Sequence, residues 1–147
     1  MKKITAIALL GLTLILSSCG ANSHLVGNIN GLWAATLSSS GAATFRFITN
    51  LTVNADGSLG SSSFNITLNN LPCTFAATTE SGSFTISGNF NGQVSGTFHY
   101  VIMSTGVEVN TLTLDGTVNG GVISGTWTVS GAIANCTGNG TFTMNPS

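Results

Sequence analysis

Apolar and polar residues alternate with a period of two along most of this sequence, and this pattern limits the possible folds more than any other feature. In the stretch GSFTISGNF, Phe84, Ile86, Gly88 and Phe90 fall on one face and small polar residues fall on the other. The stretches SFNITLN, GVISGTWTVSG and CTGNGTFTM alternate in the same way. No window shows a helical period. The pattern predicts half-buried antiparallel strands.

Short turn signals separate the alternating runs. Asn91-Gly92, Asn119-Gly120 and Asp56-Gly57 suit type I′ hairpins, which need positive φ at both central residues. Tight hairpins between successive strands give an up-and-down meander. We therefore predict an all-β fold, a small closed barrel of about eight strands, with a β-sandwich as the alternative. The sequence suggests eight or nine strands, at 31–38, 43–54, 58–69, 73–79, 83–91, 93–103, 107–119, 121–131 and 136–144.

Glycine recurs on the apolar face of several predicted strands. Residues 94–98 (VSGTF) resemble residues 123–127 (ISGTW), and residues 140–142 (GTF) resemble both. Glycine inside a strand normally weakens it. Its repetition on the core face indicates either sites where a sheet bends to close or simply a glycine-rich composition, and the sequence leaves both interpretations open.

The balance of apolar and charged residues limits the class of protein. Hydrophobic residues make up 42% of the chain and charged residues 5%, so it can build a core, unlike a disordered chain. The formal net charge is −1, and no basic patch is present in the sequence. We therefore expect no nucleic-acid partner.

The first twenty residues, MKKITAIALLGLTLILSSCG, have the anatomy of a secretory signal peptide. Lys2 and Lys3 form the positive region, and residues 4–16 form the apolar region. That apolar run is about 13 residues long, whereas a bilayer-spanning helix needs about 20. We therefore predict a cleaved signal helix rather than a transmembrane anchor.

The end of this segment resembles the lipobox of bacterial lipoproteins, an aliphatic residue and two small residues before a cysteine. Here it reads Leu16-Ser17-Ser18-Cys19. The resemblance implies cleavage between Ser18 and Cys19, diacylglycerol on the Cys19 sulfur, and an N-linked fatty acid such as palmitate. A thiolate is the nucleophile that this lipidation requires. The alternative is an ordinary signal peptide that contains a cysteine.

Three regions follow from this interpretation. They are a signal peptide at 1–18, a lipidated N-terminus with a flexible tether at 19–29, and the antiparallel β domain at 30–147. Gly20 stands where Asp favours inner-membrane retention in lipoproteins of enteric-type bacteria. The resemblance therefore implies an outer-membrane anchor, with the domain in the periplasm or at the cell surface. No cofactor is expected besides the covalent lipid.

Cys73 and Cys136 remain as an even pair after lipidation of Cys19. In an exported protein such a pair predicts one disulfide, with two free buried thiols as the alternative. The two cysteines alone cannot hold zinc, which takes three or four ligands, and only His24 and His99 could add to them. We expect no metal site.

The first predicted strand begins Gly31-Leu32-Trp33, which resembles the G-x-W of lipocalins and related calycin barrels. The resemblance implies a small meander barrel and carries no function of its own. If the barrel holds a ligand, its apolar face offers Trp33, Phe98 and Trp127. Arg46 is either an anchor for an anionic group or a surface cation.

Residues suited to catalysis are scarce. His99 is the only histidine in the β domain and is predicted on the outer face. Glu108 and Asp115 are seven residues apart, on opposite faces of a regular strand. We predict no catalytic residue and no enzymatic activity.

Three residues, Ile48, Val101 and Met103, are apolar on otherwise polar faces and mark either a partner surface or strands covered on both sides.

These observations predict a membrane-anchored lipoprotein with a small, non-catalytic β domain. Its partner is the membrane, through the lipid, together with an apolar small molecule or another envelope protein. The alternative is a structural, self-assembling surface protein with no small-molecule ligand.

Overall fold

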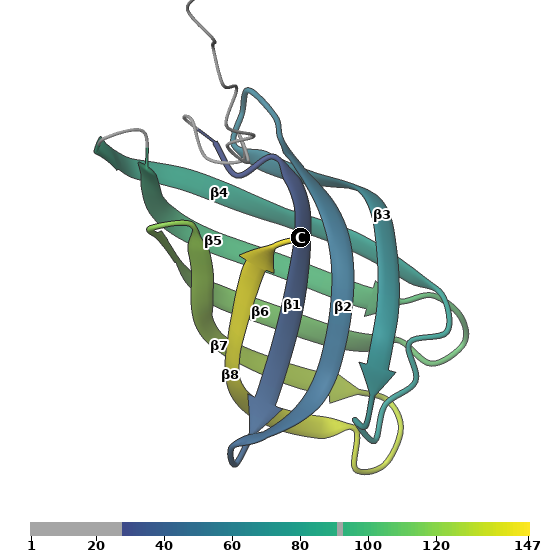
Figure 1. Ribbon diagram of the computed structural model, residues 1–147. Helices are drawn as coiled ribbons and strands as arrows, with labels where there is room; N and C mark the ends of the chain where they lie inside the picture. The colour runs from purple at the N-terminus through teal and green to yellow at the C-terminus, as the bar shows by residue number, and fades with distance from the viewer. Residues whose placement is uncertain (1–27, 91–92) are drawn as a thin grey trace, which may run out of the picture.

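The computed structural model describes residues 28–90 and 93–147, which form an eight-stranded antiparallel β-barrel with up-and-down order (Figure 1). This confirms the predicted fold class. The predicted signal helix and the lipobox lie outside the described residues. The strands are β1 (Gly31–Ser39), β2 (Ala42–Val53), β3 (Ser58–Asn69), β4 (Thr78–Phe90), β5 (Gln93–Ser104), β6 (Asn110–Asn119), β7 (Val122–Gly131) and β8 (Thr137–Pro146).

The barrel is flattened into two layers whose strands cross steeply (Figure 1). In that view β1, β2 and β3 run down the front, and β4 to β7 cross behind them. At one corner β8 bends from the back layer to the front and pairs with both β7 and β1. At the other corner β3 meets β4. The chain enters β1 at the end of the barrel where Ser147 N–H donates to Leu32 O at 2.9 Å.

One predicted strand, 73–79, is wrong. Residues 70–77 form an irregular connection between β3 and β4, and the sheet resumes only at Thr78. The period-two pattern is real, because Cys73 and Phe75 are buried while Thr74 and Ala76 are exposed. The connection crosses one end of the barrel, where its buried side chains close the core without a strand beside it.

Two predicted turns differ in detail. The β6–β7 hairpin turns at Gly120 and Gly121, with φ of 58° and 87°, one residue later than predicted. The β2–β3 link is longer than a two-residue hairpin, since Asn54 N–H donates to Ser58 O and only Gly57 of the predicted pair has positive φ. Asn91-Gly92 lies outside the described residues.

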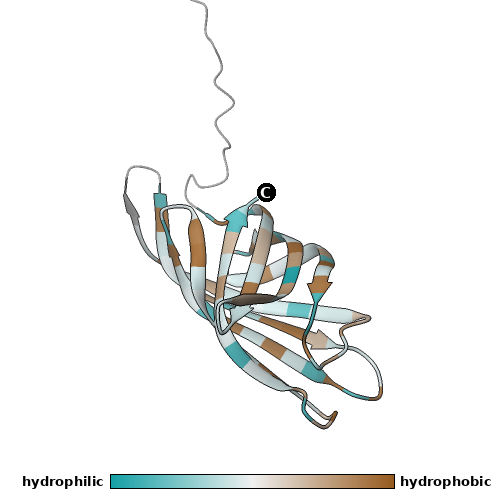
Figure 2. Ribbon diagram, turned by 60° about the horizontal axis from the view of Figure 1, so that its bottom comes forward, coloured by the Kyte–Doolittle hydropathy of each residue, from teal (hydrophilic) through white to brown (hydrophobic). Residues whose placement is uncertain are grey.

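The interior is filled by the protein's own large side chains. Figure 2 shows apolar and polar residues alternating along the strands, as the sequence predicts. The largest of the fully buried side chains are Trp33, Trp127, Tyr100, Phe45, Phe47, Phe98 and Phe142. The buried residues form one contiguous hydrophobic cluster, to which rings from both layers contribute, and Phe98 lies 5.9 Å from Tyr100 and 6.3 Å from Phe142 by ring centroids.

Inward-facing glycines make room for these rings. A Cβ on Gly96 would lie 2.6 Å from Phe84 Cε2, and one on Gly116 would lie 2.9 Å from Phe142 Cζ. A Cβ on Gly140 would lie 2.7 Å from Trp127 Nε1. Contacts this short are not tolerated, so the backbone approaches the rings closely only because the side chain is missing. The repeated glycines are therefore sites of close packing in a coiled sheet.

The β3–β4 corner is shaped by two bulges in β3. Between Thr49 and Leu51 of β2, the partner residues on β3 run from Phe64 to Ser61, so β3 carries one extra residue. A second extra residue, Thr67, lies between the partners of Arg46 and Phe47. Bulges bend the strand that carries them. The second bulge also places Leu68 opposite Arg46, on the outer side, whereas the predicted alternation in SFNITLN would put it on the face of Phe64 and Ile66.

Cys73 and Cys136 form a disulfide, as predicted, and it fastens the β3–β4 connection across the barrel end. It joins this connection to the segment before β8, over a sequence separation of 63. Asn110, fully buried, donates from Nδ2 to Thr74 O at 2.9 Å beside the bridge. The Phe75 ring packs edge-on against Phe45 with ring centroids 5.6 Å apart. The connection is thus a fixed cover on the core.

Replacing both Cys73 and Cys136 by alanine should lower the free energy of unfolding by about 4 kcal/mol, because the unfolded chain regains the entropy of a long open loop. Urea unfolding followed by tryptophan fluorescence measures the change. The reduced natural chain should unfold at the same urea concentration as the double variant. Equal stability of the oxidised chain and the double variant would contradict this role.

Gly125→Ala should destabilise the barrel by about 1–3 kcal/mol, because the new Cβ would collide with the backbone of Asp115 and Gly116. Gly60→Ala is the matched control, since its Cβ would meet only Thr52 O at 3.8 Å. Urea unfolding of both variants provides the comparison. Similar stability for the two variants would show that the inward glycines are not packing sites.

Candidate functional site

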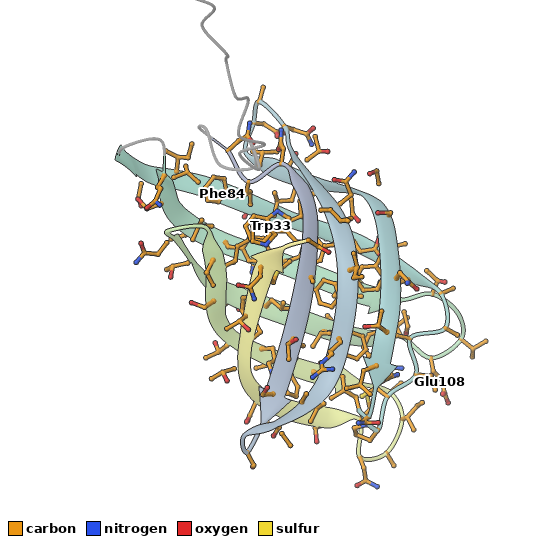
Figure 3. All side chains as sticks on the ribbon, viewed as in Figure 1. Trp33, Phe84 and Glu108 are labelled. Carbon is orange, nitrogen blue, oxygen red and sulfur yellow. A yellow bond between two sulfur atoms is a disulfide. The ribbon has the colours of Figure 1, made fainter. Side chains whose placement is uncertain are left out.

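The three aromatic residues predicted to line a ligand cavity are parts of the packed core. Trp33, Phe98 and Trp127 are exposed by 0%, 2% and 1%. Figure 3 shows Trp33 and Phe84 directed into the barrel. Both indole N–H groups are used internally, Trp33 Nε1 donating to Ile29 O at 2.9 Å and Trp127 Nε1 to Ser38 O at 3.1 Å. Their polar atoms therefore already have partners within the protein.

Arg46 is not brought to these aromatic residues. It is exposed on the outer side of β2, between buried Phe45 and Phe47. The apolar residues predicted to mark a surface are also separated, because Ile48 lies on β2 and Val101 and Met103 lie on β5, with β3 and β4 between them in the sheet order. They do not form one patch.

His99 and Asp115 form a pair that the sequence did not suggest. They face each other across β5 and β6, and His99 Nδ1 lies 2.6 Å from Asp115 Oδ1. Ser83 of β4 is the next residue in the same row, opposite His99. The row resembles a serine, histidine and carboxylate set. However, the His99 and Asp115 side chains are 46% and 63% exposed, so water screens the pair and no dry pocket encloses it.

The structure describes only some of the other residues that the sequence analysis considered. Ser18 and Cys19 lie outside the described residues. Glu108 precedes β6 and belongs to an exposed loop, not to the strand that carries Asp115, and it projects away from the barrel in Figure 3. In residues 28–90 and 93–147, no three His, Cys, Asp or Glu side chains come together as a metal site would require. The same residues contain no helix that is both long and apolar enough for a membrane span.

The corner between β3 and β4 is the one place where strand pairing nearly stops. Within the described part of the chain, these strands pair only at Ser58 with Ser83 and at Leu59 with Gly82. Beyond this point residues 60–69 and 78–81 diverge, and we call this opening the seam. Every other neighbouring pair of strands is joined by at least six residue pairs.

An apolar depression of about 290 Å³ lies at the wide end of the seam. It is open to solvent and is lined by Ile66, Asn69, Thr74, Phe75 and Ala76. Phe64 and Ile66, on the inner side of β3, are only half-buried. Phe64 lies 4.9 Å from Phe47 by ring centroids, so the aromatic core continues to this opening.

A carboxylate at the seam and buried hydroxyl groups behind it supply polar atoms next to the apolar floor. Thr49 Oγ1 lies 2.8 Å from Ser61 Oγ and 3.3 Å from the Tyr100 hydroxyl. Glu80 pairs with fully buried Ile102, so it starts on the inner side of β4, and its Oε1 accepts a hydrogen bond from Thr78 at 2.6 Å. Glu80 is half-buried. The seam therefore combines an apolar floor with an inward carboxylate.

Tyr100 has a perturbed hydroxyl. Burial raises its pKa above the ordinary value of 10.0, while hydrogen bonds with Ser61 and Thr49 lower it and the nearby charge of Glu80 raises it further. The net effect favours the neutral phenol. Glu80 and Tyr100 lie on neighbouring strands, because Glu80 pairs with Ile102 and Gly82 pairs with Tyr100 in the register of β4 and β5.

Sequence reasoning missed the seam because nothing in β3 departs from a strand pattern strongly enough. The only local signal is the run Ser61-Ser62-Ser63, which interrupts the alternation where the first bulge occurs.

Comparison of the chain with protein-family models, curated proteins and solved structures found no match. The seam is therefore interpreted from its own chemistry.

Tyr100 is the only tyrosine, so its titration can be followed by the absorbance of the phenolate. We expect a midpoint above the ordinary value of 10.0. Because the pKa is raised in the folded state, the stability contributed by the neutral phenol is complete below the unfolded pKa of about 10 and is lost as the pH rises through the folded pKa.

Glu80→Gln should lower the Tyr100 midpoint, because it removes a negative charge that opposes ionisation. Asp115→Asn, on the outer face, should leave the midpoint unchanged and serves as the control. In the natural chain, a Tyr100 midpoint at or below that of free tyrosine would contradict the burial of the hydroxyl in solution.

Proposed function

We propose that this protein is a lipid-anchored lipoprotein of the bacterial envelope, whose small β-barrel acts by binding another envelope protein and not by catalysis. Two lines of support are independent of each other. The lipobox-like Leu16-Ser17-Ser18-Cys19 supports the anchor. The filled interior supports recognition on the outside of the barrel, because its large aromatic side chains already occupy the space that an enclosed apolar ligand would need.

The filled interior is the observation that carries the proposal. A lipocalin-like cup would leave its inward aromatic residues partly exposed to a cavity, whereas Trp33, Trp127 and Phe142 are almost completely covered. The core aromatic residues are then structural, and a protein partner is favoured over the apolar small molecule that the sequence also allowed.

The absence of catalysis in the proposal rests on the positions of the titratable groups. Asp56 is in the β2–β3 link, Glu108 is in the loop before β6, and Glu80 borders the seam. Among the histidine and carboxylate side chains of the described residues, only His99 and Asp115 are in contact, on a solvent-exposed face where transition-state charge would be stabilised mainly by water. Such a pair fits a surface contact better than an active site.

The expected tether would allow the proposed partner site to lie away from the membrane. From Cys19 to the start of β1 at Gly31 the chain has twelve residues, an extended reach of about 40 Å at most. The chain enters β1 at one end of the barrel, and because β3 runs parallel to β1 through two antiparallel pairings, Asn69 lies at the opposite end. The depression, at the end of the barrel opposite the tether, would therefore be free to face the periplasm or the cell exterior.

Metabolic labelling with an alkyne analogue of palmitate tests the anchor. The natural chain, expressed in a bacterial host, should carry the label and sediment with membranes, because two or more acyl chains give stable anchoring. Cys19→Ala should lose both properties. Cys73→Ala is the matched control and should keep the label, since its sulfur belongs to the folded domain.

Labelling of the natural chain that persists in Cys19→Ala, or a natural chain that is secreted without lipid, would refute the anchor. A mature N-terminus that begins before Cys19 would also refute it.

Gly20→Asp should shift the lipidated protein toward the inner membrane in an enteric-type host, and sucrose-gradient separation of the two membranes measures that shift.

A further inference from the structure

We propose that the seam binds an extended segment of another polypeptide, which adds as a strand to the free edge of β3 and carries a lysine or arginine toward Glu80. This inference specifies the partner contact of the proposed function and rests on it only for the partner's place in the envelope. The pairing itself follows from the geometry of β3 and β4.

The first observation is a free strand edge. Residues 60–69 of β3 have β2 on one side and, within the described residues, no strand on the other. An unpaired edge presents a row of N–H and C=O groups that can pair with another chain. Natural edges are usually protected by charged side chains, proline or bulges. β3, with the sequence SLGSSSFNITLN, has two bulges but no charged residue and no proline.

The two bulges decide what kind of strand the edge can accept. They bend β3 near residues 62–63 and at Thr67, so a partner must follow a curved edge in short paired runs. Flat stacking of many identical chains requires a straight edge and is disfavoured here. A single extended segment that enters the opening between β3 and β4 satisfies this geometry.

The second observation is the apolar surface beside this edge. Side chains of an added strand would alternate between the solvent and the barrel. Those directed inward would meet half-buried Phe64 and Ile66 and the depression over Phe75. The segment should therefore have apolar residues at alternate positions, and their burial would provide most of the binding free energy.

The third observation is charge, which favours a different protein over a second copy of this chain. Residues 28–147 contain one arginine, Arg46, against four carboxylates, Asp56, Glu80, Glu108 and Asp115. No ion pair joins Arg46 to Glu80, so the carboxylate at the seam has no cation from the described residues. The β3 edge of a second copy would bring no cation to Glu80. A segment with lysine or arginine would.

The test uses the full chain purified in detergent and a phage library of random linear peptides. Selected peptides should alternate apolar residues and carry a lysine or arginine. A synthetic copy of the best peptide should slow hydrogen exchange of the backbone amides in residues 60–69. Glu80→Gln should weaken its binding by about tenfold through loss of a charge-assisted contact. Glu108→Gln, in an exposed loop, should bind as the natural chain does.

Three results would overturn the proposal. They are failure of the library to enrich any peptide, protection that falls outside residues 60–69, and equal loss of binding in Glu80→Gln and Glu108→Gln. Concentration-dependent dimers with protected β3 amides would assign the edge to a second copy instead. Peptide binding is scored separately from lipid labelling, so failure of the anchor at Cys19 and failure of the seam are distinguishable.

Discussion

Close contact between aromatic rings and inward glycines is the interaction on which the rest of this structure depends. Phe84 covers Gly96, Phe142 covers Gly116, and the backbone lies where a Cβ would collide with the ring. The sheet can therefore coil tightly enough for two layers to meet with the rings between them. Because these rings fill the interior, the protein has little enclosed volume to use for binding. In the proposed function, recognition is therefore left to the surface and to the corners.

The two corners of the flattened barrel solve the closure problem differently. At the β7–β8–β1 corner, β8 bends and stays paired on both sides, helped by Gly138 and Gly140. At the β3–β4 corner, bulges turn β3 away, and the irregular connection held by the disulfide covers the core instead. Covering the core in this way does not pair the strand edges. An opening with a free edge, an apolar floor and a carboxylate is the consequence.

Much of this fold can be read from the sequence because alternation of apolar and polar residues sets both the strands and their faces. The residue range of β3 matches the prediction, and those of β1, β2, β5, β7 and β8 match within two residues at each end. Cys73 and Phe75 show the limit of the method, because they alternate with polar neighbours in a segment that has no strand partner. Leu68 shows another limit, since one extra residue reverses the side that every later side chain faces.

The candidate site was harder to predict because it depends on how strands pair and not on the alternation within one strand. The seam depends on where pairing between β3 and β4 stops, which is a property of two segments and of the bulges between them, and not of a local motif. The placement of Glu80 near Tyr100, and of His99 opposite Asp115, likewise arises from cross-strand register. The lipobox-like segment differs, because it is a local motif that can be recognised in the sequence alone. Its cleavage and lipidation stay a prediction.

Native mass spectrometry of the full chain, purified from membranes under gentle conditions and measured before and after denaturation, tests the filled interior most directly. A filled interior predicts one mass in both states, equal to the processed chain with its acyl groups, less two hydrogens for the Cys73–Cys136 disulfide. A small molecule that is present in the native protein and lost on denaturation would contradict it, and would make the barrel a ligand carrier.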